Sequence, residues 1–336
     1  MDSVLVVGGG SWGTAFADYL ARRGMRTCLW AREEEVRAAI RSDRENRLFL
    51  PGVRLDDRLA VGADLEGEAG RAGLWVLAVP SKFMRSVLER LRGCRRGEHV
   101  LVCLSKGFEA DSLKTMSQVA ADALGPGVAR RWLTISGPSF ARELAAGHPT
   151  AVAAAGEDDG LLGRVQEDFS SPTLRVYRST DLRGLEVAGS LKNVMAIASG
   201  MINGLGFGYN TTASMVTRAN TEISRLGVRL GGRPETFWGL AGIGDLMLTC
   251  FGALSRNFQL GRRIALGDTL AAVERSTPMV AEGVETTKAV RRLAEQLGIE
   301  MPIAGAVHRV LFEGRDAGAA VAELMTRSLK SEWTTS

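Results

Sequence analysis

The first half of the chain alternates short apolar runs with amphipathic stretches. Runs rich in β-branched residues, each expected to form a buried strand, occupy 4–7, 27–30, 74–79, 100–104 and 132–135. The stretch 13–23 has helical spacing and ends at Gly24, a residue type that favours helix C-termini. The stretch 33–41 opens with acidic residues, which suit a helix N-terminus. This alternation predicts a parallel sheet whose strands are joined by helices through right-handed connections.

The second half has a different pattern. Two further apolar runs, 151–155 and 174–177, predict strands that complete the sheet, and strand patterns stop near residue 181. Proline-free stretches with apolar residues three and four apart follow, and they predict helices over 186–201, 211–226, 284–297 and 317–329. The sequence therefore predicts an α/β domain over residues 1–184 and an all-helical domain over residues 185–336.

The composition limits the class of protein. With 336 residues, the chain exceeds the roughly 250 residues at which single cores stop growing, so two domains are expected. No apolar run approaches the roughly 18 residues of a membrane span, and we expect none. The four cysteines form no CxxC pair and no basic leader precedes Val4, as is typical of a cytoplasmic protein.

The distribution of histidine and charge argues against several kinds of site. The three histidines are dispersed, so we predict neither a metal site nor a Ser-His-Asp triad, and proton transfer must use another residue type. The 42 basic and 38 acidic residues are well mixed, which argues against nucleic acid as a partner. The net charge of +4 fits small phosphorylated ligands better.

A glycine-rich turn directly follows the first predicted strand. The sequence GGGSWG satisfies GxGxxG at Gly8, Gly10 and Gly13 and leads into a predicted helix. Strand, turn and helix then follow the order of a Rossmann-type doubly wound fold, in which the turn brings a pyrophosphate to the helix N-terminus. We therefore predict a dinucleotide cofactor bound by the first domain.

The residue after the second strand bears on which dinucleotide binds. Such folds usually place an acidic residue there for the ribose of NAD, but here Arg32 follows Ala31. Arg32 can pair with the 2'-phosphate of NADP, although it can also be a solvated arginine, and Glu33 can still serve a ribose hydroxyl. We predict that NADPH is used at least as well as NADH, so both NADP and NAD are expected cofactors.

Further short sequence strings follow one another along the chain. They are VPS at 79–81, SKG at 105–107, SGPSFA at 136–141, LKN at 191–193, GDL at 244–246 with Thr249, SRN at 255–257, and EG at 282–283. Together with the glycine-rich turn, this series resembles the NAD(P)-dependent glycerol-3-phosphate dehydrogenase family from residue 8 to about residue 288. The resemblance implies reversible reduction of dihydroxyacetone phosphate to glycerol 3-phosphate, a role in glycerophospholipid synthesis, and a homodimer.

The resemblance also implies the chemistry of the site. Lys192 is expected to be the general acid in reduction, which requires its pKa to fall through burial or through a nearby cation such as Lys106. Asp245 is expected to orient Lys192, although its charge alone would raise the lysine pKa. Asp245 and Thr249 are four residues apart and would share one helix face. Catalytic roles are thus expected for Lys192, Lys106 and Asp245.

The remaining contacts are expected to divide between the two ligands. The motif and the resemblance together predict cofactor contacts from Gly8, Gly10, Ser11, Trp12, Gly13, Arg32, Phe83, Lys106, Ala141, Arg256, Val280 and Glu282. They predict substrate contacts from Lys106, Gly137, Ser139, Lys192, Asn193, Asp245, Thr249, Ser255, Arg256 and Asn257. Within these sets, an arginine fork beside an amide suits a phosphate dianion.

Two other readings stay open at this level. The chain could be a different two-domain dehydrogenase, of the β-hydroxyacid or UDP-sugar type. The latter needs a thiol nucleophile, and Cys250 lies close to Asp245 in the sequence. Alternatively, it could be a non-catalytic protein that senses NADP.

Overall fold

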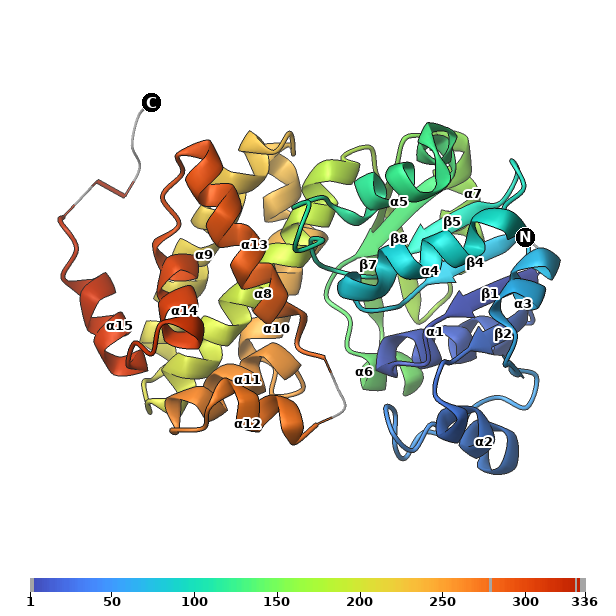
Figure 1. Ribbon diagram of the computed structural model, residues 1–336, viewed down its shortest axis with the longest axis horizontal. Helices are drawn as coiled ribbons and strands as arrows, with labels where there is room; N and C mark the ends of the chain where they lie inside the picture. The colour runs from blue at the N-terminus through green and yellow to red at the C-terminus, as the bar shows by residue number, and fades with distance from the viewer. Residues whose placement is uncertain (1–2, 278–279, 330, 333–336) are drawn as a thin grey trace.

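The computed structural model describes residues 3–277, 280–329 and 331–332, in which an eight-stranded sheet precedes a helical half (Figure 1). The strand order is β3-β2-β1-β4-β5-β6-β7-β8, and neighbouring strands are parallel except β6 and β7. The strands are β1 Ser3–Val7, β2 Arg26–Trp30, β3 Ala60–Gly62, β4 Leu74–Leu77, β5 Val100–Cys103, β6 Trp132–Ser136, β7 Thr150–Gly156 and β8 Leu174–Ser179.

Helices cover both faces of the sheet. They are α1 Ser11–Arg22, α2 Glu34–Asp43, α3 Leu65–Arg71, α4 Met84–Leu91, α5 Met116–Leu124, α6 Ala141–Ala145 and α7 Asp159–Phe169. Alternate residues of β1 point to opposite faces: Val4 and Val6 pack in one core with α1, α2 and α7, while Leu5 and Val7 pack in another with α3, α4 and α5. Burial on both faces explains why these strands are apolar throughout rather than alternating.

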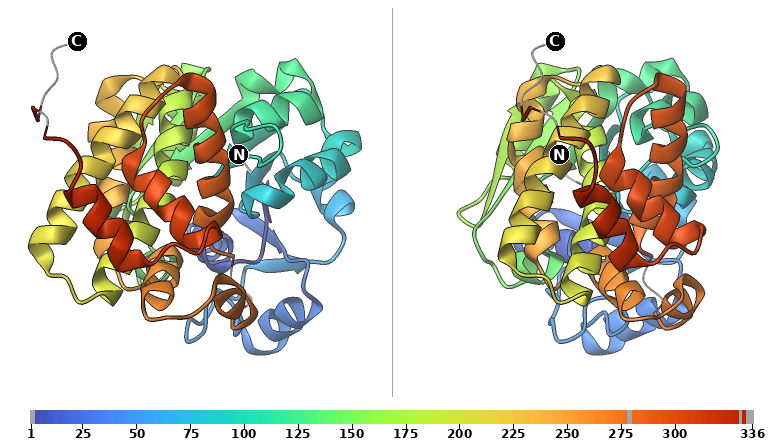
Figure 2. Two further views of the ribbon diagram at one scale, coloured as in Figure 1. Left: turned by 60° about the vertical axis from the view of Figure 1, so that its left-hand side comes forward. Right: turned by 90° about the vertical axis from the view of Figure 1, so that its left-hand side faces the viewer.

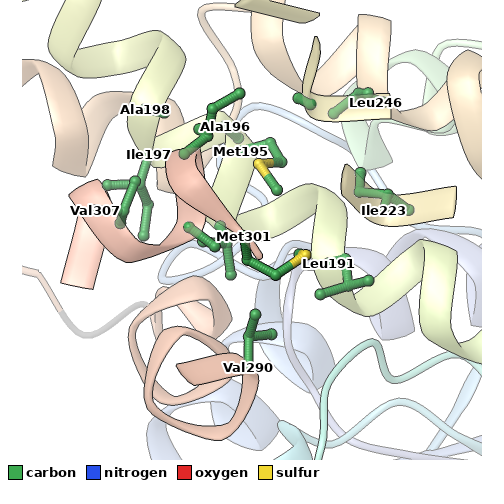
Figure 3. Close-up of a cluster of buried hydrophobic side chains, with 14 of the residues drawn as sticks. Leu191, Met195, Ala196, Ile197, Ala198, Ile223, Leu246, Val290, Met301 and Val307 are labelled. Atoms are coloured by element: carbon green, nitrogen blue, oxygen red, sulfur yellow. The ribbon is translucent and has the colours of Figure 1, made fainter. Parts of the chain in front are cut away.

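The second half consists of helices packed around α8, and it lies beside the sheet in Figure 1 and in front of it in the right-hand view of Figure 2. Its helices are α8 Leu182–Gly204, α9 Tyr209–Arg229, α10 Asp245–Phe251, α11 Arg256–Ala265, α12 Leu270–Arg275, α13 Glu282–Leu297, α14 Pro302–Phe312 and α15 Ala317–Met325. Apolar side chains of α8, such as Leu191, Met195 and Ile197, meet those of α9, α10, α13 and α14 in one core (Figure 3). Among the described residues, no helix is long and apolar enough to cross a membrane.

One close helix contact places a candidate site residue. A Cβ on Gly200 would lie 1.9 Å from the backbone oxygen of Phe258, so α8 and α11 approach to a distance that only glycine allows at this point. This contact holds the first turn of α11, which carries Arg256, against α8, which carries Lys192.

The sequence predicted the class of fold and all seven of its expected strands correctly. The helix expected over 317–329 ends already at Met325, and three further differences concern the sheet and α8. The edge strand β3 was missed because three residues are too few to show a pattern. The sheet is not wholly parallel: α6, between β6 and β7, packs on α1, and β7 runs antiparallel to β6. Helix α8 begins earlier than expected, at Leu182, because the Asp181 side chain caps it by accepting from Gly184 N.

Candidate active site

A cavity of about 280 Å³ opens where the carboxyl ends of the parallel strands face the helical half. The sites predicted from sequence converge on it from both halves of the chain. Its walls include Ser11, Trp12, Lys106, Ser139, Ala141, Lys192, Asn193, Asp245, Thr249, Ser255, Arg256, Asn257, Val280 and Glu282. The other predicted residues, Gly8, Gly10, Gly13, Arg32, Phe83 and Gly137, lie outside this lining.

Lys192 projects its amine from the buried middle of α8 into the cavity. Its Nζ donates to Asp245 Oδ1 at 2.6 Å and to Thr249 Oγ1 at 2.8 Å. Thr249 gives its own proton to the backbone oxygen of Asp245, so towards Lys192 it acts as an acceptor. Both partners stand on α10, one turn apart, as their spacing predicts. An ammonium group has three donors, so these two contacts leave one for a ligand.

The carboxylate of Asp245 joins two lysines. Its Oδ2 accepts from Lys106 Nζ at 2.6 Å, and Lys106 also approaches the backbone oxygen of Gly137 at 3.4 Å. Burial would raise the pKa of the Asp245 carboxyl, but the two lysines hold the pKa below its ordinary value. The trio of Lys106, Asp245 and Lys192 therefore leaves one net positive charge at the cavity wall, where a developing oxyanion would be stabilised.

Burial decides the acidity of Lys192. It lowers the pKa of the amine from the ordinary 10.5 to about 8; the charge of Asp245 acts against this shift, and that of Lys106 adds to it. The opposing effects that the sequence left unweighed thus combine to favour a lysine that exchanges protons near neutral pH. Such a group can serve as a general acid in one direction of a reaction and as a base in the other.

The glycine-rich turn forms an anion site built from backbone. Gly8 has a φ of +123°, and a Cβ on Gly13 would lie 2.1 Å from Gly8 O, so neither position tolerates a side chain. Over Gly10, in contrast, a Cβ would meet no protein atom within 4 Å. No side chain caps the first turn of α1, so its amides remain for a ligand. These features fit the pyrophosphate of a dinucleotide.

Trp12 connects this turn to the strand ends. Its Nε1 donates to Ser139 O at 3.1 Å, and its ring stacks on Phe16 with 5.1 Å between centroids. Ala141 follows at the start of α6, whose helix packs on α1. The turn and the loop after β6 therefore form one continuous part of the cavity wall.

Arg32 and Phe83, predicted separately, lie together beyond the cavity lining. The Arg32 guanidinium stands 5.6 Å from the centroid of the Phe83 ring, and its Nη2 donates to Glu33 Oε1 at 3.0 Å. The Arg32 side chain is 69% exposed, so an incoming ligand can reach it. This arrangement suits an adenosine moiety with an anionic substituent, and it also keeps Glu33 close to any ribose there.

All three residues of the SRN string line the cavity, and two of them also make structural contacts. Ser255 caps α11, its Oγ accepting from Phe258 N, and Arg256 begins that helix as an exposed side chain on the cavity wall. Asn257 donates to Asn193 Oδ1 at 2.9 Å and accepts from Gly283 N at 3.0 Å. Arg256 is therefore the member of this string best placed to bind an anion.

Glu282 begins α13 and ties it to the first half of the chain. Its Oε1 accepts from Ser81 N at 3.2 Å. Burial raises the pKa of its carboxyl, and the positive charge of Arg256 partly offsets that effect. Glu282 therefore stands between the Arg256 charge and the loop after β4, at the mouth predicted to receive the cofactor.

Cys250 does not suit a nucleophilic role. Its side chain is fully buried in the core of the helical half, and burial raises the pKa of its thiol to about 12. A thiol with this pKa remains protonated near neutral pH and is a poor nucleophile. The structure therefore removes the residue on which the UDP-sugar dehydrogenase reading depended.

The comparisons with known proteins cover nearly the whole chain. Residues 3–161 match the model of the NAD-dependent glycerol-3-phosphate dehydrogenase N-terminus, and residues 181–322 match that of the C-terminus. The chain belongs to the NAD-dependent glycerol-3-phosphate dehydrogenase family. The resemblance inferred from the ordered motifs is thus confirmed.

Individual members of the glycerol-3-phosphate dehydrogenase family show how close the similarity is. A glycerol-3-phosphate dehydrogenase [NAD(P)+] of Geobacter sulfurreducens is 49% identical over 97% of this chain and 98% of its own length. The crystal structure of glycerol-3-phosphate dehydrogenase from Coxiella burnetii is 34% identical, covers 97% of this chain and 99% of that chain, and gives a TM-score of 0.92. A ketopantoate reductase of Ralstonia eutropha, 13% identical with a TM-score of 0.60, shares the fold alone.

Sequence reasoning missed one wall of the cavity. Phe49, Leu50 and Pro51, in the connection after α2, line it beside Ser11 and Trp12. No motif marks this segment, and its only local signal is an apolar patch ending in Pro-Gly. Ser136 was also missed; its Oγ lies 3.5 Å from Asp245 Oδ2, at the end of β6.

Proposed function

We propose that this chain reduces dihydroxyacetone phosphate to glycerol 3-phosphate reversibly, with NAD(P)H as reductant. The observation that carries the proposal is the buried Lys192 amine, held by Asp245 and Thr249 in the cavity beside the dinucleotide turn. The family supports the substrate class, and the proton donor and cationic groups that line one cavity support the chemistry.

The residues divide the work as follows. Arg256 binds the phosphate, and Lys106 and Lys192 polarise the carbonyl oxygen. The bound nicotinamide supplies the hydride. Lys192 then passes its free ammonium proton to the new alkoxide, while Asp245 and Thr249 keep Nζ in place. In the oxidation direction, neutral Lys192 receives the alcohol proton.

We place the cofactor on the first half of the chain. The free amides at the N-terminus of α1 and the open space over Gly10 would hold its pyrophosphate, and Arg32 and Phe83 would hold its adenosine end. The exposed guanidinium favours the 2'-phosphate of NADP, so NADPH serves at least as well as NADH. Val280 and Glu282 complete the cofactor site from the helical half.

The remaining assignments concern organisation in the cell. We infer a nucleotide-binding domain over residues 1–184 and a helical catalytic domain over residues 185–336. We also infer a cytoplasmic homodimer that binds small phosphorylated ligands rather than nucleic acid and supplies glycerol 3-phosphate for phospholipid synthesis. Sedimentation of the purified protein tests the dimer directly.

The deciding experiment follows NADPH oxidation with dihydroxyacetone phosphate, with unphosphorylated dihydroxyacetone and a β-ketoacid as matched controls. We expect turnover with the phosphorylated ketone and little with either control. Preferred turnover of the β-ketoacid would replace the proposal with a β-hydroxyacid dehydrogenase. Tight NADPH binding without turnover of any substrate would favour a cofactor sensor.

A further inference from the structure

The cavity wall formed by Phe49–Pro51 belongs to a loop whose two ends are joined by a backbone hydrogen bond. Between α2 and β3 the chain doubles back, and Leu55 N donates to Arg44 O at 2.7 Å across the neck of the loop. Within it, Gly52 N donates to Glu45 Oε1 at 2.7 Å. The loop therefore has a defined shape of its own, and its tip presents Phe49–Pro51 to the cavity.

Asn46 connects this loop to the dinucleotide turn. Its side chain is fully buried, and Nδ2 donates to Gly9 O at 2.7 Å and to Thr14 Oγ1 at 2.8 Å. Its Oδ1 accepts from Phe49 N at 3.0 Å, and its backbone oxygen accepts from Leu50 N at 2.8 Å. The side-chain amide of Asn46 therefore donates to the glycine-rich turn and the start of α1, and it accepts from the cavity wall.

A second bond joins the same two parts. Ser11 Oγ, in the first turn of α1, donates to Phe49 O at 2.5 Å. The backbone oxygen of Phe49 is therefore held directly by the first turn of α1, and its backbone N is held by Asn46, whose own amide donates to Gly9 O of the glycine-rich turn. A shift of the turn moves the wall with it, and a shift of the wall moves the turn.

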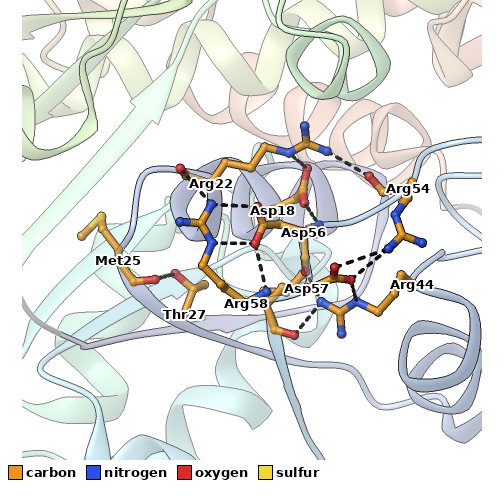
Figure 4. Close-up of polar contacts among 10 residues, drawn as sticks. Asp18, Arg22, Met25, Thr27, Arg44, Arg54, Asp56, Asp57 and Arg58 are labelled. Atoms are coloured by element: carbon orange, nitrogen blue, oxygen red, sulfur yellow. Dashed lines mark hydrogen bonds and ion pairs between the residues drawn. The ribbon is translucent and has the colours of Figure 1, made fainter.

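The other end of the connection has an independent anchor farther along α1. Asp18, 1% exposed, accepts from Asp56 N at 2.6 Å and pairs with Arg22 at 2.7 Å (Figure 4). This anchor resembles Asn46 in burial and in tying the same connection to the same helix. It differs in touching neither the glycine-rich turn nor the cavity wall.

We propose that Asn46 is a positioning residue that fixes the Phe49–Pro51 wall against the dinucleotide turn, so that one buried side chain sets the binding of both cofactor and substrate. The inference rests on the proposed function for its substrate. Asn46 itself touches neither reacting atom. It acts by holding the two surfaces between which the nicotinamide and the ketone must meet.

The test compares Asn46→Ala with Asp18→Ala, because both remove a buried anchor of the same connection. We expect both to lower Tm. Only Asn46→Ala should raise both the Kd of NADPH, measured by its fluorescence without substrate, and the KM for dihydroxyacetone phosphate, each by about tenfold, the equivalent of one lost buried hydrogen bond or two. Its kcat should fall less than these constants rise, since Lys192 and Asp245 stay in place. Asp18→Ala should leave both constants within about twofold, because it touches neither surface.

Matching kinetic behaviour of the two variants would reduce Asn46 to a structural anchor and overturn the inference. If Asn46→Ala does not fold, Thr14→Val removes one acceptor of Asn46 Nδ2 while keeping the shape of the side chain. Thr14→Val should move both constants in the same direction by a smaller factor, and unchanged constants would equally overturn the inference. Failure of the wild-type enzyme to reduce dihydroxyacetone phosphate would instead refute the proposed function, and the NADPH titration would still decide the role of Asn46.

Discussion

The two ends of the reaction cavity are made in different ways. At the end proposed for the cofactor, the groups that would face the pyrophosphate are backbone amides and the space left by glycines, all within one strand-turn-helix unit. At the substrate end, they are charged side chains, such as Lys106, Lys192 and Asp245, which come from three separate segments. A backbone site can be distorted by substitution but not stripped of its groups, whereas a side-chain site can lose one chemical function at a time.

The two ends also differ in how deeply their charged groups are buried. The substrate end keeps two lysines and a carboxylate almost out of water, which is unfavourable unless the charges pair closely. That same burial lowers the pKa of Lys192 to about 8 and makes proton exchange possible. The glycine-rich turn at the cofactor end contributes backbone amides rather than titratable side chains, and it can therefore set affinity without controlling proton transfer.

The largest expected effect is at the substrate end. Lys192→Met keeps the aliphatic stem but removes the amine, so kcat should fall at least about a hundredfold, the range for general acid-base groups. The Kd of NADPH should stay within a few-fold, because the cofactor rests mainly on the first half. Steady-state kinetics and NADPH fluorescence measure the two quantities separately. A variant that keeps more than a tenth of the wild-type kcat would show that Lys106 or water delivers the proton.

The matching change at the cofactor end is Gly13→Ala. The added Cβ would lie 2.1 Å from Gly8 O, so the turn must shift to make room for it. Overpacking of this kind costs about 1–3 kcal/mol. We expect the Kd of NADPH to rise by about thirtyfold while kcat at saturating cofactor falls only slightly. Titration of NADPH fluorescence tests this, with Gly70→Ala, whose Cβ would meet nothing within 4 Å, as a control outside the site. If kcat fell as far as in Lys192→Met, the proposed separation of the two ends would be wrong.

The cofactor end was easier to predict from the sequence than the substrate end. The glycine-rich turn is a local motif, so its strand, its helix and its ligand could be predicted together. The pairing of Lys192 with Asp245 spans 53 positions, and only the resemblance suggested it. Ser255 caps its own helix by accepting from Phe258 N, a local contact where the sequence predicted a substrate contact. Nothing local could show that Asn257 binds Asn193 or that Phe49 reaches the cavity. These contacts depend on packing between segments distant in sequence, which residue patterns do not encode one segment at a time.

Arg256 tests whether substrate affinity can be separated from proton transfer. Arg256→Ala should raise the KM for dihydroxyacetone phosphate by about tenfold or more, as expected for loss of a charge-assisted contact of roughly 1.5–3 kcal/mol. Turnover of unphosphorylated dihydroxyacetone, which we expect to be low in the wild-type enzyme, should change little. Parallel assays with the two ketones measure the contrast, and Arg262→Ala, one turn and a half further along α11, is a matched control. Equal losses for both ketones would undo the phosphate assignment.

The pH dependence tests the coupling of the lysine to its carboxylate. Reduction needs protonated Lys192, so kcat/KM for reduction should fall as pH rises above about 8, while oxidation should increase up to that pH. Asp245→Asn removes the charge that raises the lysine pKa, so both limbs should move to lower pH by about one unit. The pH profiles of the two enzymes in both directions give the shift. If the limbs moved to higher pH instead, the titrating group would not be Lys192.

The smallest expected effect is at the exposed edge of the cofactor site. Arg32 is 69% exposed and already pairs with Glu33, so its contact with a 2'-phosphate lies in a well-solvated region where one ion pair contributes about 0.2–1 kcal/mol. Arg32→Ala should therefore lower the ratio of kcat/KM for NADPH to that for NADH by about fivefold at most, with NADH itself nearly unaffected. Glu33→Gln is the converse control, because it frees the guanidinium and should raise the same ratio. Measuring both ratios at low and high salt sharpens the test, since screening should shrink the two effects together. If the NADPH to NADH ratio did not change in Arg32→Ala, the choice of cofactor would depend on the buried backbone turn. The cofactor end would then have no side-chain selectivity of its own.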